Sequence, residues 1–295
     1  MIPKEIIKQV KRLEIKSKYL VNSLFQGNYQ SVFKGRGLEF DGIREYARGD
    51  DYRSLDWKVS ARMGTPHVKK FTEERQLVVQ LLFDISASTG FGTREKRKRM
   101  IATELSATIA FSAVSNNDQI GLILFSDRLE KFNKAGKGKL YALRTLRDIL
   151  YTKGEGKKTD LSIPLNFLMN SAKQKCVVFL ISDFLNVEIP KILKSAKNRH
   201  DIIPVIVRDP LEMELPDAGY LELRDFETGE VVVVNSSNKK VREKYRENCL
   251  KRDEELKNKF KNMQLDYIEL FTNKPHEKSL LSFFKKREIL RGMKG

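Results

Sequence analysis

Short apolar runs alternate with longer amphipathic or charged segments from residue 77 onward. This alternation predicts strands joined by helices that cover both faces of a sheet. The fold class is therefore α/β, with a doubly wound, mainly parallel sheet. The predicted strands are 77–84, 120–126, 176–182, 202–207 and 266–271, and the predicted helices are about 94–115, 139–150, 161–173, 189–198, 238–262 and 276–286.

Two further segments depart from the regular alternation. Residues 127–133 follow the second strand almost without a break, which predicts one antiparallel edge strand joined by a tight turn. Residues 220–224 and 231–234 flank the turn Glu227-Thr-Gly229-Glu, so we expect an inserted β-hairpin at about 215–237.

Residues 1–76 differ from the rest, and we expect them to form a region that packs on a main domain of residues 77–295. They begin with a basic helix over about 4–24, whose apolar stripe has two interpretations. Packing on the body of the protein is favoured, because surface helices of globular proteins carry such stripes. Peripheral attachment to anionic lipid is the alternative. The stripe consists of Ile6, Val10, Leu13, Leu20 and Leu24.

The charge of the chain is strongly basic, with 56 Lys and Arg against 39 Asp and Glu and a net charge of +17. Such a charge attracts acidic partners, nucleic acid or anionic membranes. The basic residues are mostly interleaved with acids, and no RNA-binding signature accompanies them, which favours a solvated surface. Nucleic-acid binding is the alternative function, through the cluster Arg94, Lys96, Arg97, Lys98 and Arg99.

No transmembrane segment is predicted, because no apolar run approaches the roughly 18 residues that a span requires. The first residues also lack the apolar core of a signal peptide. We therefore expect a cytoplasmic protein, or one held peripherally at the membrane by its first helix. Cys176 and Cys249 show no CxxC spacing, which predicts two free thiols.

Oxygen-bearing side chains gather where predicted strands end. Asp84, Ser86 and Ser88 follow the first strand, and Asp183 ends the strand 176–182. Thr159 lies in a Gly-containing loop just before a helix. Ligands bind beyond the carboxyl ends of the strands in doubly wound sheets, so these three segments should converge. A donor set made only of oxygen suits Mg²⁺, with Mn²⁺ or Ca²⁺ as alternatives.

This constellation resembles the metal-ion-dependent adhesion site (MIDAS) of von Willebrand factor type A domains, a Rossmann-like fold. The resemblance implies that Ser86, Ser88 and Thr159 ligate Mg²⁺, while Asp84 and Asp183 orient its waters and the hydroxyls. Neutral hydroxyls leave most of the metal's charge uncompensated, so an open position would attract a carboxylate from a partner protein. Thr89 and Asp160 are alternatives to Thr159.

Residues 35–75 are unusually rich in Arg, Asp, Glu and aromatic side chains. A structural interpretation, in which arginines pair with nearby carboxylates and the aromatic residues pack on the sheet domain, is favoured because Asp and Gly serve turns readily. A partner-contact surface is the alternative. The candidate residues are Arg44, Asp50, Asp51, Arg53, Asp56, Trp57 and Arg62.

The same stretch is similar to the signature of the family called domain of unknown function 58 (DUF58). The matching elements are Gly37-Leu-Glu39-Phe40, Arg44-Glu-Tyr46, Gly49-Asp50-Asp51-Tyr-Arg53, Asp56-Trp57 and Ala61-Arg62. The resemblance implies association with MoxR-type AAA+ ATPases and a role as an adaptor in maturation or chaperone-like remodelling of other proteins. The client protein would supply the acidic residue to the metal.

The usual signatures of an enzyme are missing from the sequence. His67, His200 and His276 have no Ser or Cys elbow near them, and the phosphate loop GxxxxGK[ST] is absent. The segment Asp84-Ile-Ser86 lacks the second acid of an aspartate-nucleophile phosphatase. We therefore expect a binding module and not an enzyme.

Overall fold

The computed structural model describes residues 4–21, 39–72, 76–90, 97–224 and 229–292. The chain divides into two compact units, one of residues 1–32 and 77–295 and the other of residues 33–76. The first helix thus belongs to the larger unit. The packing of residues 33–76 on the main domain stays a prediction.

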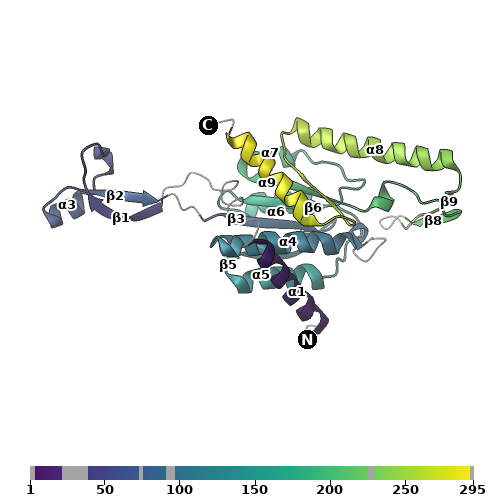
Figure 1. Cartoon of the computed structure of the whole chain (residues 1–295), viewed down its shortest axis with the longest axis horizontal. Helices are drawn as coiled ribbons and strands as arrows, with labels where there is room; N and C mark the ends of the chain where they lie inside the picture. The colour runs from purple at the N-terminus through teal and green to yellow at the C-terminus, as the bar shows by residue number, and fades with distance from the viewer. Residues whose placement is uncertain (1–3, 22–38, 73–75, 91–96, 225–228, 293–295) are drawn as a thin grey trace. The chain divides into compact units, whose positions relative to one another are not determined.

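The larger unit is built on one six-stranded sheet with the order β10-β7-β6-β3-β4-β5. Figure 1 labels β3, β5 and β6 of this sheet and the helices that flank it. All neighbouring strands are parallel except β4 and β5. This confirms the predicted α/β class, with a mainly parallel sheet and one antiparallel edge strand. The strands are β3 (Val78–Asp84), β4 (Gln119–Phe125), β5 (Leu129–Lys137), β6 (Val177–Ser182), β7 (Asp201–Arg208) and β10 (Ile268–Phe271).

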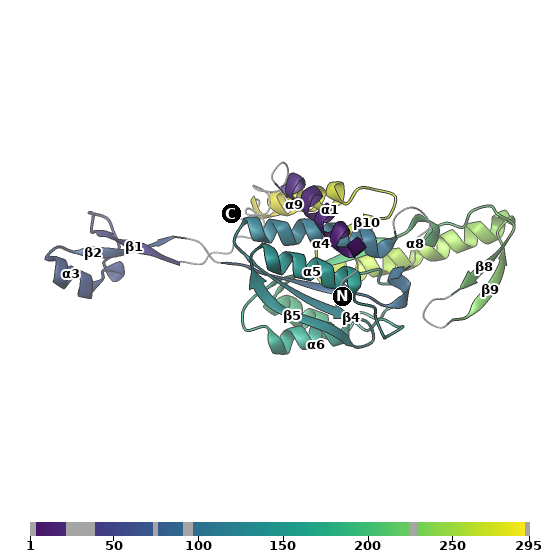
Figure 2. The ribbon, with the colours of Figure 1, turned by 90° about the horizontal axis from the view of Figure 1, so that it is seen from below.

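Helices cover both faces of this sheet (Figure 2). On one face α4 contacts α1, α5 and α9, and on the other α6 contacts α7 while α8 joins the same apolar cluster. The predicted edge strand, 127–133, was too short, because the pairing with β4 continues to Lys137. The helices are α1 (Lys4–Leu20), α4 (Lys98–Ser115), α5 (Lys139–Tyr151), α6 (Ser162–Ser171), α7 (Ile192–Arg199), α8 (Lys239–Asn262) and α9 (His276–Gly292).

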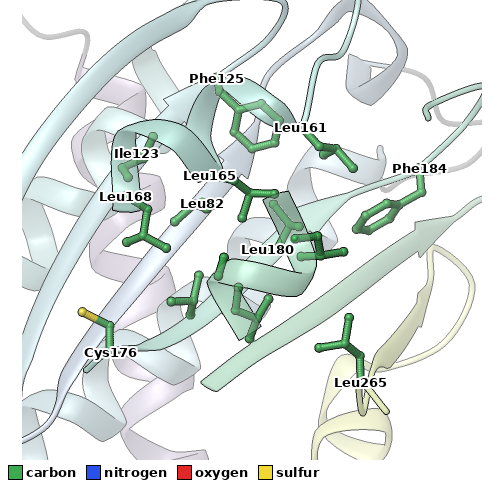
Figure 3. Packing of buried hydrophobic residues seen from close by; sticks show 14 of the residues in the cluster. Leu82, Ile123, Phe125, Leu161, Leu165, Leu168, Cys176, Leu180, Phe184 and Leu265 are labelled. Carbon is green, nitrogen blue, oxygen red and sulfur yellow. The ribbon is translucent and has the colours of Figure 1, made fainter. Parts of the chain in front are cut away.

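The central strands are buried along their whole length because helices cover both of their faces. On the face covered by α6, Leu82, Ile123 and Leu180 pack against Leu165 and Leu168 (Figure 3). Alternate residues of the same strands face α4. Because helices cover both faces of these strands, nearly every strand residue is apolar, and this explains the continuous apolar runs in the sequence.

Helix α1 lies on α4 and α5. Val10, Leu13 and Leu20 of its apolar stripe are buried, as the packing interpretation expects. Lys16 adds ion pairs to Glu104 at 3.3 Å and Glu277 at 3.4 Å. The side chains of Ile6 and Leu24 lie outside the described residues. Among the described helices, none combines the length and apolarity that crossing a bilayer would need.

The predicted insertion forms an antiparallel hairpin of β8 (Tyr220–Arg224) and β9 (Val231–Asn235). A short helical turn, η4 (Pro210–Glu212), precedes it after β7. The two cysteines are buried free thiols, as predicted.

The smaller unit is a hairpin with a short helix. Strands β1 (Glu39–Glu45) and β2 (His67–Thr72) pair in antiparallel fashion. Between them come the turn η2 (Tyr52–Ser54) and helix α3 (Trp57–Met63). Asp56 caps α3, because its carboxylate accepts the backbone N–H groups of Lys58 and Val59.

The order of the strands reverses at β3. The chain moves from β3 to β4 on one side and later returns to pair β6 with β3 on the other. The carboxyl ends of β3 and β6 are therefore adjacent at the switch point, where doubly wound folds bind their ligands.

Candidate functional site

Asp84 is the centre of the polar cluster at this switch point. It ends β3 and is 1% exposed. Its Oδ1 accepts the backbone N–H of Ser86 at 2.9 Å. Its Oδ2 accepts the hydroxyls of Ser182 at 2.7 Å and Thr159 at 3.1 Å. Segments more than 70 residues apart are thus tied to one carboxylate.

Three hydroxyls lie together beside Asp84. Ser86 Oγ is 3.2 Å from Ser88 Oγ and 2.8 Å from Thr159 Oγ1. Mg²⁺ holds oxygen ligands at about 2.1 Å in an octahedron, so neighbouring ligand oxygens lie about 3.0 Å apart. The observed spacings are those of adjacent ligand positions.

Thr159 is the hydroxyl that the distant loop delivers, and the two alternatives to it form other hydrogen bonds. The Thr89 hydroxyl donates to the carbonyl of Ser86 at 2.8 Å. Asp160 caps the start of α6, where its carboxylate accepts the N–H and the hydroxyl of Ser162. Both groups are thus engaged in local structure.

The loop that carries Thr159 approaches the β3 end very closely. A Cβ atom at Gly154 would lie 2.6 Å from the carbonyl oxygen of Ile85, so only glycine fits without a shift of the backbone. Glu130 on β5 holds the same loop. Its Oε1 accepts the N–H groups of Glu155 at 3.0 Å and Gly156 at 2.9 Å, together with the Ser126 hydroxyl at 2.6 Å.

Asp183 reaches the same edge of the sheet but is held by other groups. Its Oδ2 accepts from Lys98 Nζ at 2.5 Å, and its Oδ1 accepts the N–H of Leu185 at 3.1 Å. Asp84, Lys98 and Asp183 line one cavity of about 10 Å³, room for about one water molecule. In the described structure no hydrogen bond joins Asp183 to the three hydroxyls.

Lys98 is the residue whose role the sequence did not indicate. Its ammonium group, 1% exposed, lies between Asp183 and Glu212 and is 2.5 Å from each carboxylate. Burial raises the pKa of Glu212. Arg208 donates to the Asp183 carbonyl and pairs with Asp253 of α8. Because these partners come from distant segments, no local pattern in the sequence distinguishes Lys98 from the other basic residues of 94–99.

This geometry also bears on the basic cluster considered for nucleic acid. Lys98 is enclosed by carboxylates, and Arg99 donates to the carbonyls of Ile149 and Thr152. Neither side chain is therefore available to phosphates. Arg97 is exposed, while Arg94 and Lys96 lie outside the described residues.

Asp84 is held in an environment that disfavours its charge. Burial and then repulsion from Asp183 raise the pKa of Asp84 from its ordinary 3.8 to about 6. The hydrogen bonds from Ser182 and Ser86 oppose this shift without cancelling it. A cation beside Asp84 would relieve the cost of its negative charge.

Without bound metal, the raised pKa of Asp84 makes the stability of the protein depend on pH. A carboxyl group with a raised pKa binds more protons in the folded than in the unfolded chain, so the free energy of unfolding falls as pH rises. We expect Asp84 to cause such a loss between pH values of about 4 and about 6, worth about 1.4 kcal/mol per unit of pKa difference. Urea denaturation in chelator, compared between wild type and Asp84→Asn, measures it. Parallel stability curves for the two proteins would contradict the assignment.

The donor set fits a hard cation that relies on hydroxyls. Ser86, Ser88 and Thr159 offer neutral oxygens, and Asp84 offers a carboxylate that accepts the Thr159 hydroxyl and the backbone N–H of Ser86. Over the ranges that the structure describes, no group of three or more His, Cys, Asp or Glu side chains is arranged to hold a metal ion. These residues therefore do not form a metal site built mainly from carboxylates or imidazoles.

The network predicted in the smaller unit is present in part. Arg44 forms a two-pronged ion pair with Asp50 at 2.6 and 2.7 Å, which lowers the pKa of Asp50 to about 2. Asp51 accepts the N–H of Arg53. These contacts fit the structural interpretation. The side chains of Tyr52 and Trp57 are exposed, which fits a contact surface, and Arg62 is exposed as well.

Comparison with known proteins gives a family match over most of the chain. The profile of a family described as protein of unknown function DUF58 matches residues 42–255. An uncharacterised protein of Mycobacterium tuberculosis strain H37Rv is 30% identical over 225 residues, which cover 75% of this chain and 71% of that protein. An uncharacterised protein of Mycobacterium avium is 33% identical over 75 residues, covering 25% of this chain and 44% of that protein.

Solved structures resemble the chain more remotely. One is an aerotolerance-related membrane protein from Bacteroides fragilis, which has a TM-score of 0.45, is 16% identical and covers 71% of this chain and 99% of that one. Another is an uncharacterised membrane-spanning protein from Vibrio fischeri, with a TM-score of 0.24, 16% identity and coverage of 73% and 98%. Likenesses of this size carry no argument about function.

Proposed function

Because the chain belongs to the DUF58 family, we propose that it is a non-enzymatic, metal-dependent adaptor that binds other proteins. The observation that carries the proposal is the hydrogen-bonded cluster of Asp84, Ser86, Ser88 and Thr159 at the switch point of the sheet. Together with Asp183, which reaches the same edge of the sheet, these residues resemble the MIDAS of von Willebrand factor type A domains.

Ser86, Ser88 and Thr159 would hold the metal, while Asp84 and Asp183 would hold its waters and orient the hydroxyls. The metal, Mg²⁺ or alternatively Mn²⁺ or Ca²⁺, would supply an uncompensated positive charge that attracts a carboxylate. Lys98 pairs with Asp183 and offsets part of its negative charge, although repulsion from Asp183 still raises the pKa of Asp84. The attraction for a partner's acid would come from the metal charge that the neutral hydroxyls leave uncompensated.

The partner that we propose is a MoxR-type AAA+ ATPase, with a client protein that supplies the acidic residue. This part of the proposal rests on the resemblance of the signature region to families that accompany such ATPases. We propose that this protein meets the ATPase and the client in the cytoplasm or at the inner surface of the membrane. The exposed Trp57 and Tyr52 of the smaller unit are candidates for a second contact.

The test is a pull-down from native cells with the wild-type protein and with Ser86→Ala/Ser88→Ala. We expect wild type to retain an AAA+ ATPase or a client in Mg²⁺ but not in chelator, and the double variant to retain neither. Equal retention under all conditions would show that the contact is not bridged by a metal.

A further inference from the structure

A second, basic site lies at the opposite end of the sheet from Asp84. A cavity of about 950 Å³ opens where β7 begins and where α7 and α8 end, and α9 forms a further wall. We call it the His200 cavity. Its charged lining residues are Lys175, Lys197, Lys257, Lys261, Lys286, Arg287, Asp201 and Asp266.

The acidic residues of this cavity are already paired with a basic side chain. Arg287 forms a two-pronged ion pair with Asp201 at 2.8 and 2.9 Å and a further bond to Asp266 at 3.0 Å. Lys257 pairs with Asp253 at 2.8 Å and Glu269 at 2.7 Å. These ion pairs engage Asp201 and Asp266, the two carboxylates of the cavity wall, and two of its six basic residues.

Four lysines remain around the cavity. Within the described part of the chain, no carboxylate forms an ion pair with Lys175, Lys197, Lys261 or Lys286, although Lys197 contacts the amide oxygen of Gln264 at 3.4 Å. The carboxyl ends of α7 and α8 contribute roughly half a negative charge each. Four ammonium groups outweigh these two helix ends and the one wall carboxylate charge that Arg287 does not balance, so the cavity has a net positive potential.

His200 supplies an unused hydrogen-bond donor in the cavity wall. It is 1% exposed, and its Nδ1 accepts the backbone N–H of Cys176 at 3.2 Å. A neutral imidazole that accepts at Nδ1 carries its proton on Nε2. Burial, followed by the charges of Arg199 and Lys175, lowers the pKa of His200 and so favours this neutral form.

The Nε2–H of His200 is buried and has no hydrogen-bond partner within the described structure. Leaving such a donor unpaired costs about 1–3 kcal/mol, so an acceptor that reached it would bind favourably. An acceptor that also carries several negative charges would match the four lysines.

We propose that the His200 cavity binds the phosphate groups of a small soluble molecule. Phosphate oxygens accept from ammonium groups and from an imidazole N–H together, and they carry the charge that the lysines lack. A volume of about 950 Å³ is at the upper end of small-molecule pockets, which suits a ligand with more than one phosphate. This site is separate from the proposed metal site and does not depend on it.

The test uses tripolyphosphate as the probe, in chelator and at constant ionic strength, with isothermal titration calorimetry. We expect saturable binding of one tripolyphosphate per chain. Lys261→Gln/Lys286→Gln should weaken it by about tenfold or more, because each change removes a charged hydrogen-bond donor. Lys240→Gln/Lys244→Gln, which removes two exposed lysines of α8 outside the cavity, is the matched control and should bind like wild type.

Nitrogen-15 NMR of labelled histidines supplies a readout that needs no change at His200. On saturation the Nε2–H signal of His200 should shift, while those of His67 and His276 stay in place. Absence of saturable binding, equal weakening by the two lysine pairs, or an unmoved His200 signal would each overturn the proposal. ATP and vesicles of phosphatidic acid then identify the source of the phosphate, and binding to vesicles alone would overturn a site for soluble ligands.

Discussion

Replacing Lys98 with methionine should lower the free energy of unfolding by about 3–5 kcal/mol, the usual cost of removing one partner from a buried ion pair. The ammonium of Lys98 is 1% exposed and 2.5 Å from both Asp183 and Glu212. Without it two carboxylates would face each other in a buried site. Urea denaturation at pH 7 measures the loss.

Two further variants separate this explanation from a general effect of mutation. Arg97→Met removes the exposed basic residue next in the chain and should change stability by less than about 0.5 kcal/mol. Lys98→Met/Glu212→Gln should recover part of the loss, since it removes one of the unpaired charges. A loss below about 1 kcal/mol for Lys98→Met would mean that water reaches this ion pair.

Removing two hydroxyls from the β3 end should nearly abolish Mg²⁺ binding. In Ser86→Ala/Ser88→Ala we expect the affinity for Mg²⁺ to fall by about 100-fold, roughly tenfold for each ligand lost. Ser86 and Ser88 lie in the polar cluster with their hydroxyls 3.2 Å apart, and the Ser86 hydroxyl is also 2.8 Å from that of Thr159. Calorimetric titration of metal-free protein with MgCl₂ gives the affinity.

The control for this experiment is Ser171→Ala/Ser195→Ala. It removes two exposed hydroxyls from α6 and α7, so Mg²⁺ binding should match wild type. If the Ser86/Ser88 variant bound Mg²⁺ as tightly as wild type, the metal would lie elsewhere. If it lost Mg²⁺ but kept its partner, the adaptor would use another surface.

The sheet could be predicted from the sequence because its signals are local. Val78–Asp84 and Val177–Ser182 are continuous apolar runs, and strands covered on both faces require such runs. The end of β5 at Lys137 was missed because residues 134–137 are held by pairing with β4, and their own composition is charged and Gly-containing. Pairing with a neighbouring strand decided this boundary.

Part of the polar cluster could also be predicted, because its sequence signals are local. Asp84, Ser86 and Ser88 are adjacent in sequence, and Thr159 follows a recognisable Gly-containing loop. Glu130, which holds that loop, and Ser182, which donates to Asp84, carry no local signal of these roles. Their functions exist only because the fold brings their segments to one edge of the sheet.

The sequence by itself thus determined the α/β class, the succession of strands and helices along the chain from residue 77 onward, and the oxygen-rich end of β3, because periodicity and strand-end chemistry depend on neighbouring residues. The tertiary structure determined which charged side chains are engaged in buried ion pairs. It enclosed Lys98 between Asp183 and Glu212, and it left four lysines and the Nε2–H of His200 around one cavity. Electrostatic partnership depends on distance in space and on burial, and a list of charged residues specifies neither.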